Sequence, residues 1–144
     1  RQVNAIYDWD NYSTYYHKDL LGANNNIIIS SPVISGPKVY ELINLLKEKQ
    51  MSGVQITIVT WAPDSYRFGD AAYWMQLHED MRQAGFYIKT VEESCERFAV
   101  IDQEVVWYGN INLLAKDKVD DSIMRVMSKE IASELMEITF GDNG

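Results

Sequence analysis

Residues 95–102 have the sequence CERFAVID, and residues 105–112 continue with VVWYGNIN. The two apolar runs in this stretch, residues 97–101 and 105–108, are joined by three polar residues, which predicts an antiparallel hairpin. Polar residues and one glycine frame these runs at both ends: Cys95, Arg97, Asp102, Gly109, Asn110 and Asn112. The stretch therefore predicts both the centre of a sheet and a group of candidate site residues.

The spacing of these residues suggests how they are grouped in space. Side chains two positions apart on a strand share a face, so we expect Cys95 and Arg97 to be neighbours above the sheet. Gly109 at a strand end permits a close backbone approach, and the amides of Asn110 and Asn112 offer hydrogen-bond donors. Taken singly, Asp102 is typical of a turn and Arg97 of a strand residue that reaches solvent. Only the joint spacing indicates a site.

Outward from the hairpin, apolar runs alternate with helical periodicities. We expect further strands at residues 3–7, 26–30, 54–60, 86–91 and 122–127, and helices at residues 13–23, 37–50, 70–84 and after Ser128. Ser13 and Ser128 are the expected helix caps, and Ile131, Leu135 and Ile138 are expected to face inward. The order of these elements predicts an α/β domain in three αβα layers, with a mixed sheet flanked by helices.

The length and the net charge of the chain argue against several classes of function. The 144 residues suit one domain, and no apolar run approaches the ~20 residues that a membrane-spanning helix needs. The net charge of -8 argues against unaided, non-specific binding of nucleic acid, which depends on Lys and Arg. The single cysteine fits a reducing compartment, so we expect a cytoplasmic protein. Since the chain begins at Arg1 without an initiator Met, we expect it to be part of a longer protein.

Ligands for a metal or a nucleotide are few. The two histidines, His17 and His78, fall in predicted helices far from the hairpin, and we expect both to face solvent. One cysteine and two scattered histidines make no zinc ligand set, and no glycine-rich phosphate loop is present. We therefore expect no metal and no cofactor.

The polar frame of the hairpin resembles the phospholipase D superfamily, whose signature is His-x-Lys, four residues, Asp, and then Gly followed shortly by Asn. The resemblance is strongest to the phospholipase D-like domains C-terminal to superfamily-one DNA/RNA helicases, which typically read H-x-K-F-A-I-I-D and I-V-W-Y-G-S-I-N-L-L. Residues 122–135 and 7–13 are also similar to that subfamily. The resemblance implies one phospholipase D-like domain over residues 1–144, excised from the C-terminal part of a longer helicase-like protein.

In the superfamily the His is the nucleophile, a second His protonates the leaving group, the Lys and Asn hold phosphate oxygens, and the Asp orients the His. The carry-over makes Cys95, Arg97 and Asp102 the catalytic positions. It also makes Arg97, Asn110 and Asn112 the phosphate-binding positions and Gly109 a structural residue. Arg97 replaces the Lys and Asn110 the usual Ser, whereas Cys95 stands in place of the nucleophilic His.

The cysteine decides the functional expectation. An imidazole can attack, leave and donate a proton, and a thiol cannot repeat that sequence at the same geometry. Arg97 is a nearby cation that favours a thiolate, but Glu96 disfavours one. Ile101 also occupies the position where cysteine-dependent phosphatases carry an Arg. We therefore expect a degenerate, non-hydrolytic site.

The leading hypothesis is an accessory domain of a DNA/RNA helicase-like protein that serves dimerisation or positions nucleic acid or a partner. The alternative is an active, metal-independent phosphodiesterase or nuclease with a dimeric site. Because family domains with one motif copy pair two subunits, the resemblance implies a homodimer. A membrane partner is not expected, since no amphipathic or basic membrane face is visible.

Overall fold

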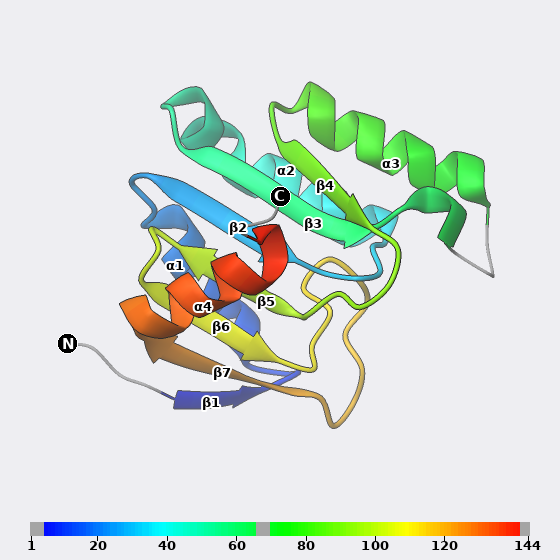
Figure 1. Ribbon diagram of the computed structural model, residues 1–144. Coiled ribbons are helices and arrows are strands. Elements are labelled where there is room, and N and C mark those ends of the chain that lie inside the picture. The colour runs from blue at the N-terminus through cyan, green and yellow to red at the C-terminus, as the bar shows by residue number, and fades with distance from the viewer. Residues whose placement is uncertain (1–4, 66–69, 142–144) are drawn as a thin grey trace.

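The predicted hairpin lies at the centre of a seven-stranded mixed sheet (Figure 1). The computed structural model describes residues 5–65 and 70–141. The strand order is β1-β7-β6-β5-β2-β3-β4, in which only β2–β3 and β3–β4 are parallel. The α/β class with a mixed sheet flanked by helices is confirmed.

The elements agree with the predicted ones to within a few residues. The strands are β1 (Ala5–Asp8), β2 (Asn26–Ser30), β3 (Gln55–Trp61), β4 (Tyr87–Val91), β5 (Phe98–Ile101), β6 (Val105–Gly109) and β7 (Ser122–Met127). The helices are α1 (Tyr12–Leu21), α2 (Gly36–Met51), α3 (Ala71–Gln83) and α4 (Lys129–Phe140), with a short 3-10 turn, η1 (Pro63–Ser65). The expected first strand began at Val3, and its first two residues lie outside the described part.

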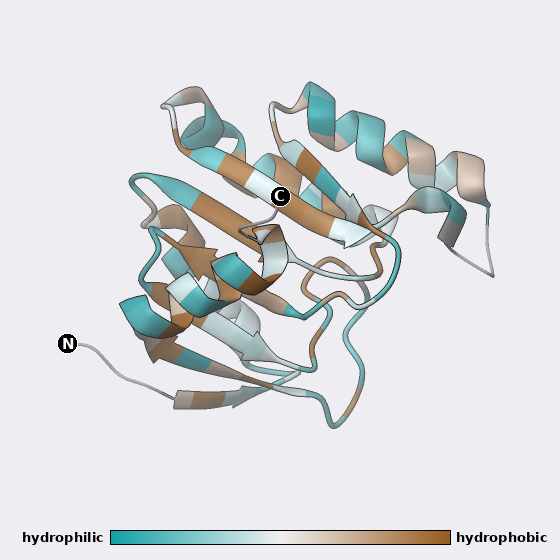
Figure 2. Ribbon diagram, in the orientation of Figure 1, coloured by the Kyte–Doolittle hydropathy of each residue, from teal (hydrophilic) through white to brown (hydrophobic). Residues whose placement is uncertain are grey.

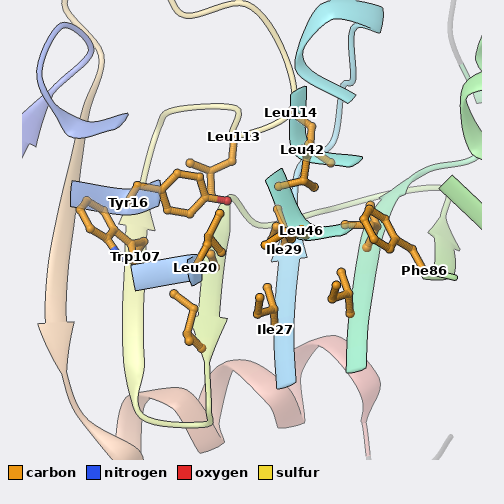
Figure 3. Packing of buried hydrophobic residues seen from close by; sticks show 14 of the residues in the cluster. Tyr16, Leu20, Ile27, Ile29, Leu42, Leu46, Phe86, Trp107, Leu113 and Leu114 are labelled. Atoms are coloured by element: carbon orange, nitrogen blue, oxygen red, sulfur yellow. The ribbon is translucent and has the colours of Figure 1, made fainter. Parts of the chain in front are cut away.

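The sheet is covered unequally on its two faces. Helices α1, α2 and α3 pack on one face over a large core that includes Ile27, Ile29 and Trp107. Figure 3 shows this core, with Tyr16 and Trp107 at one end and Phe86 at the other. Only α4 covers the opposite face, over a smaller cluster. Apolar residues therefore run through both faces of β2 and β5, which are the most hydrophobic strands in Figure 2.

The turn of the hairpin is tied to the beginning of β2 by one carboxylate. Asp102 accepts hydrogen bonds from the backbone N–H groups of Asn24 (2.9 Å), Asn25 (2.7 Å) and Asn26 (3.1 Å). Its own N–H donates to the carbonyl of Asn26 at 2.8 Å. Asp102 and Gln103 have φ angles of 55° and 59°, a left-handed pair that type I′ hairpin turns need. The side chain thus satisfies the backbone of a neighbouring turn that would otherwise face water.

The other end of the hairpin depends on a glycine. A Cβ atom at Gly109 would lie 2.7 Å from the Cα atom of Ile123, and closer still to the carbonyl oxygen of Ser122. The close backbone approach expected at Gly109 is therefore made to β7.

A second polar tie joins α1 to the sheet. The Asp19 carboxylate accepts from the indole N–H of Trp107 (2.8 Å) and from Nε of Arg125 (2.6 Å). Both partners lie on neighbouring strands, β6 and β7, so one helix side chain fixes α1 over this part of the sheet.

Helix caps and faces were only partly predicted. Ser128 caps α4 as expected, and accepts from the N–H of Ile131 at 3.0 Å. Helix α1 begins at Tyr12 with Asn11 as its N-cap, so the expectation for Ser13 is wrong. Ile131 and Ile138 are also wrong as inward residues, since they are 39% and 65% exposed. Leu135 faces inward as expected, and Ala132 and Met136 pack beside it on the sheet, so α4 is rotated about its axis relative to the predicted orientation.

His78 was expected to face solvent, but it is buried, with 2% of its surface exposed. It lies on the core side of α3 between Leu77 and Met81, and its Nε2 atom has no hydrogen-bond partner. Burial, and secondarily Arg82, lowers the pKa of the imidazole. His78 is therefore a neutral core residue.

We predict that replacing Asp102 with Asn lowers the free energy of unfolding by about 1–2 kcal/mol, because an amide has one acceptor oxygen instead of two. Urea denaturation measures the loss. The matched control is Gln103→Asn on the same turn, with an expected change below about 0.5 kcal/mol. Equal losses in the two variants would contradict a specific role for the carboxylate.

We predict that stability falls as the pH is lowered from 7 to 5, and that His78→Phe weakens this dependence. The folded-state pKa of His78 lies below its unfolded value, so protons bind preferentially to the unfolded chain below about pH 6.5. The pKa of His17 is lowered by burial too, so His17→Phe is the companion variant. Thermal denaturation across this pH range gives the slopes. An unchanged slope in His78→Phe would show that the histidine is not held neutral.

Candidate functional site

The motif residues before β5 and after β6 meet at one edge of the sheet. Strand β5 is antiparallel to β2 and β6, so its beginning lies beside the carboxyl ends of both. Ser30 at the end of β2 pairs with Phe98, and the N–H of Gly109 donates to the carbonyl of Arg97 at 3.4 Å. This edge brings together Cys95, Arg97 and Asn112.

Arg97 and Asn112 form the best-defined contact of the site. Nε of Arg97 donates to Oδ1 of Asn112 at 3.0 Å. Asn112 is buried, with 8% of its surface exposed, whereas Arg97 is half-buried. Among the described residues the two Nη groups of Arg97 have no hydrogen-bond partner and no carboxylate within ion-pair distance. The guanidinium is thus fixed through one edge and retains donors for an oxyanion.

The loop that carries Asn112 is held by the segment after β2. The Oγ atom of Ser31 accepts from the N–H of Leu114 at 3.1 Å, and the N–H of Ser35 donates to the carbonyl of Leu114 at 2.7 Å. Leu113 and Leu114 are buried in the large core. Apolar anchoring of these two residues therefore positions the amide beside Arg97.

Cys95 lies in the connection before β5, and not within a strand as the i, i+2 argument assumed. Its half-buried Sγ atom lies 3.4 Å from Oγ of Ser30 and packs against the cluster under α4. A small cavity of about 170 Å³ adjoins it, lined also by Ile138 and Thr139 at the end of α4. Among the described residues, Cys95 and Arg97 form no hydrogen bond with each other, and the Arg97 side chain is directed to Asn112 instead.

The thiol is in its protonated form at neutral pH. Burial raises the pKa of Cys95, and nearby Glu96 raises it further. The hydrogen bond between Ser30 and Cys95 and the charge of Arg97 oppose this shift without reversing it. Since the thiolate is the nucleophilic form, the surroundings of Cys95 work against nucleophilic attack.

Glu96 is engaged in structural contacts at the same edge. Its carboxylate accepts from the hydroxyl of Tyr108 at 2.6 Å, and its backbone carbonyl accepts from Oγ of Ser30 at 2.6 Å. The bond to Glu96 raises the pKa of the Tyr108 phenol, so this hydroxyl remains protonated. The acidic residue that lies between Cys95 and Arg97 in sequence is thus held by Tyr108 and Ser30.

Two predicted site residues lie elsewhere or have other partners. Asp102 is at the opposite end of β5, roughly 16 Å along the strand from Arg97 at about 3.3 Å per residue. The role that the resemblance implied for it, orienting the group at position 95, does not fit this geometry, because its carboxylate binds the turn at residues 24–26. Asn110 is exposed, and its Oδ1 accepts from the N–H of Ser122 at 2.9 Å, which leaves only its amide N–H groups for a phosphate.

Ser30 is the site residue that sequence analysis missed. It is 1% exposed and contacts both Cys95 and the backbone of Glu96. The signal was its position as the last residue of the buried run NIIIS, where polar side chains at strand ends line sites. The sequence could not show that Ser30 lies beside Cys95, because β2 and β5 are distant in sequence and their pairing was not predicted.

Neither histidine replaces the missing imidazole. His17 packs against Tyr16 near Glu41, and His78 is buried on α3. Within residues 5–65 and 70–141, no three His, Cys, Asp or Glu side chains lie together as metal ligands. No helix in these ranges is long and apolar enough to cross a membrane.

We predict that Cys95 reacts slowly with iodoacetamide at neutral pH, with a titration midpoint above that of an unstructured thiol peptide. Burial is the main cause, and Glu96→Gln should lower the midpoint while Ser30→Ala raises it. The alkylation rate measured as a function of pH reports on Cys95 alone, because the chain has one cysteine. A midpoint below that of the peptide would indicate an activated thiolate.

Comparison with solved structures shows a shared fold. NucT from Helicobacter pylori has a TM-score of 0.70 and 9% identity, over 96% of this chain and 93% of NucT. Nuc from Salmonella typhimurium, a phospholipase D family member, has a TM-score of 0.73 and 13% identity, over 96% of this chain and 90% of Nuc. The archaeal chromatin protein TrmBL2 has a TM-score of 0.69 and 10% identity, over 97% of this chain and 49% of TrmBL2.

The sequence itself has no significant match among curated proteins. A family model described as the phospholipase D-like domain of cardiolipin synthase matches residues 16–140, which is most of the chain. The match spans the sheet from β2 to β7 and every residue of the edge described above. The chain therefore belongs to the family of phospholipase D-like domains.

Proposed function

We propose that this chain is a phospholipase D-like accessory domain whose site binds a phosphate group without hydrolysing its ester. The observation that carries this proposal is the state of Cys95. A protonated, half-buried thiol stands where the nucleophile of the family is expected, and its pKa is raised. The general acid is also missing, because neither histidine lies at this edge.

The residues at the phosphate-binding positions, Arg97 and Asn112, match the family motif more closely than Cys95 at the position of the nucleophile. Arg97 is positioned by Asn112 and keeps its outer N–H groups for a ligand. An arginine fork forms paired hydrogen bonds to a phosphate, whereas the Lys of the family motif acts as a point charge. The substitution therefore keeps a cation that can hold a phosphodiester through paired hydrogen bonds.

The ligand class that we propose is nucleic acid, presented within a larger protein. TrmBL2 is described as binding DNA by a novel mode, and it supports this class although the shared fold alone does not establish it. With a net charge of -8, the isolated chain has little general attraction for a polyanion. Binding by this domain would thus depend on local contacts such as Arg97 and on the remainder of the protein.

The proposed setting is the C-terminal part of a helicase-like protein, with the domain acting as a homodimer. The support is the resemblance of CERFAVID and VVWYGNINLL to helicase-associated domains. A Walker-A sequence encoded upstream of Arg1 would support the helicase setting. Light scattering on the purified chain that gives a monomer mass at micromolar concentration would contradict the dimer.

We predict no cleavage of single- or double-stranded DNA or RNA by the purified chain, with or without divalent metal. Gel assays with labelled oligonucleotides measure this. Cleavage that Cys95→Ala abolishes would overturn the proposal in favour of the alternative, an active metal-independent phosphodiesterase or nuclease.

In the same preparation, Arg97→Ala should weaken oligonucleotide binding several-fold, as measured by fluorescence anisotropy at low salt. The matched control is Lys129→Ala, which removes one positive charge at the beginning of α4, near the opposite end of the sheet. Equal weakening by the two variants would show that only net charge matters and would reject Arg97 as a specific contact.

A further inference from the structure

Strand β4 leaves one edge of the sheet open. The N–H of Ala62 donates to the carbonyl of Val91 at 3.0 Å, so Val91 directs its backbone groups toward β3. Backbone direction alternates along a strand, so Tyr87 and Lys89 also point to β3, whereas Ile88 and Thr90 point outward. Within the described residues no hydrogen bond is made to the outward N–H and C=O groups of these two residues.

The opposite edge of the sheet is protected at one of its outward residues. In β1 the N–H of Trp9 donates to the carbonyl of Asp121, so Asp8 is an outward residue by the same alternation. Its N–H is capped by Oδ1 of Asn11 at 3.0 Å. Sheet edges that carry such caps resist pairing with another chain, and β4 has no equivalent cap among the described residues.

Side chains on both faces of β4 determine which kind of peptide this edge can bind. On the α3 side, Thr90 borders a cavity of about 620 Å³ that is also lined by His78 and Arg82. On the α4 side, the ammonium of Lys89 lies 5.9 Å from the ring centre of Phe140. No carboxylate within residues 5–65 and 70–141 lies within ion-pair distance of Lys89. The edge thus presents an unpaired cation.

We propose that β4 binds an extended acidic peptide segment of a partner protein, which adds an eighth strand to the sheet. The segment would pair with the backbone groups of Ile88 and Thr90, as in other cases of strand addition. Lys89 would then occupy a non-hydrogen-bonded position, where facing side chains are close, and would meet a Glu or Asp of the peptide.

A second copy of this chain fits the edge less well. Antiparallel pairing of two β4 strands about a two-fold axis between their outward residues sets the lysines of both copies close together. Like charges facing each other across strands are destabilising, and a lysine on an edge strand is a common device against self-pairing. The charge of Lys89 therefore favours an acidic partner over a copy of itself.

The test uses the purified chain with two labelled peptides, TVTETVT and TVTKTVT, which differ only in the central charge. We expect the acidic peptide to bind at least about tenfold more tightly in fluorescence anisotropy. On its addition, the amides of Ile88 and Thr90 should gain protection from hydrogen exchange. Lys89→Glu should reverse the preference between the two peptides.

Thr90→Pro should abolish binding, because it removes an outward N–H and leaves the bonds to β3 in place. Ile6→Pro is the matched variant at the β1 edge and should bind normally, with circular dichroism confirming that both variants fold. No binding up to about 1 mM, equal binding of both peptides, or binding unaffected by Thr90→Pro would overturn the proposal. A chain dimer that Thr90→Pro dissociates would overturn it in favour of self-pairing.

Discussion

The arrangement of the sheet depends on the contact between the Asp102 carboxylate and the backbone of Asn24, Asn25 and Asn26. Strands β2 and β5 are far apart in sequence and lie side by side at the centre of the sheet. Their apolar side chains drive burial but define register weakly, because similar residues occupy both faces. The carboxylate adds a directional constraint at one end of the pair. A correct register then places Ser30 beside Cys95 at the other end.

This contact gives the spacing of Asp102 in CERFAVID a structural meaning. Asp102 does not lie at the edge that carries Cys95 and Arg97. Its hydrogen bonds help to set the register of β2 against β5, on which that edge depends. Gly109 and Asn110 have comparable roles, since one allows β7 to approach and the other binds the backbone of Ser122. In this chain Asp102, Gly109 and Asn110 therefore stabilise the framework of the sheet, and the Arg97–Asn112 pair lies at the same edge as the Cys95 thiol.

Local sequence predicted much of this structure. The run NIIIS was predicted residue for residue as β2, and the hairpin and the Ser128 cap were predicted because each depends on neighbouring residues. The errors came from packing over longer range. The orientation of α4 and the burial of His78 depend on which helix covers which face, and helical periodicity alone does not determine this. Strand order was beyond the sequence pattern for the same reason, and so was the contact between Ser30 and Cys95.

We propose that Cys95 is not a phosphate nucleophile. Its geometry and surroundings support this, because burial and Glu96 hold the thiol protonated. The most direct measurement is the intact mass of the protein after incubation with a phosphodiester substrate and rapid acid quenching. We expect the unmodified mass, because a protonated thiol forms no covalent intermediate. A phosphoryl adduct mapped to Cys95 by peptide mass spectrometry would contradict it.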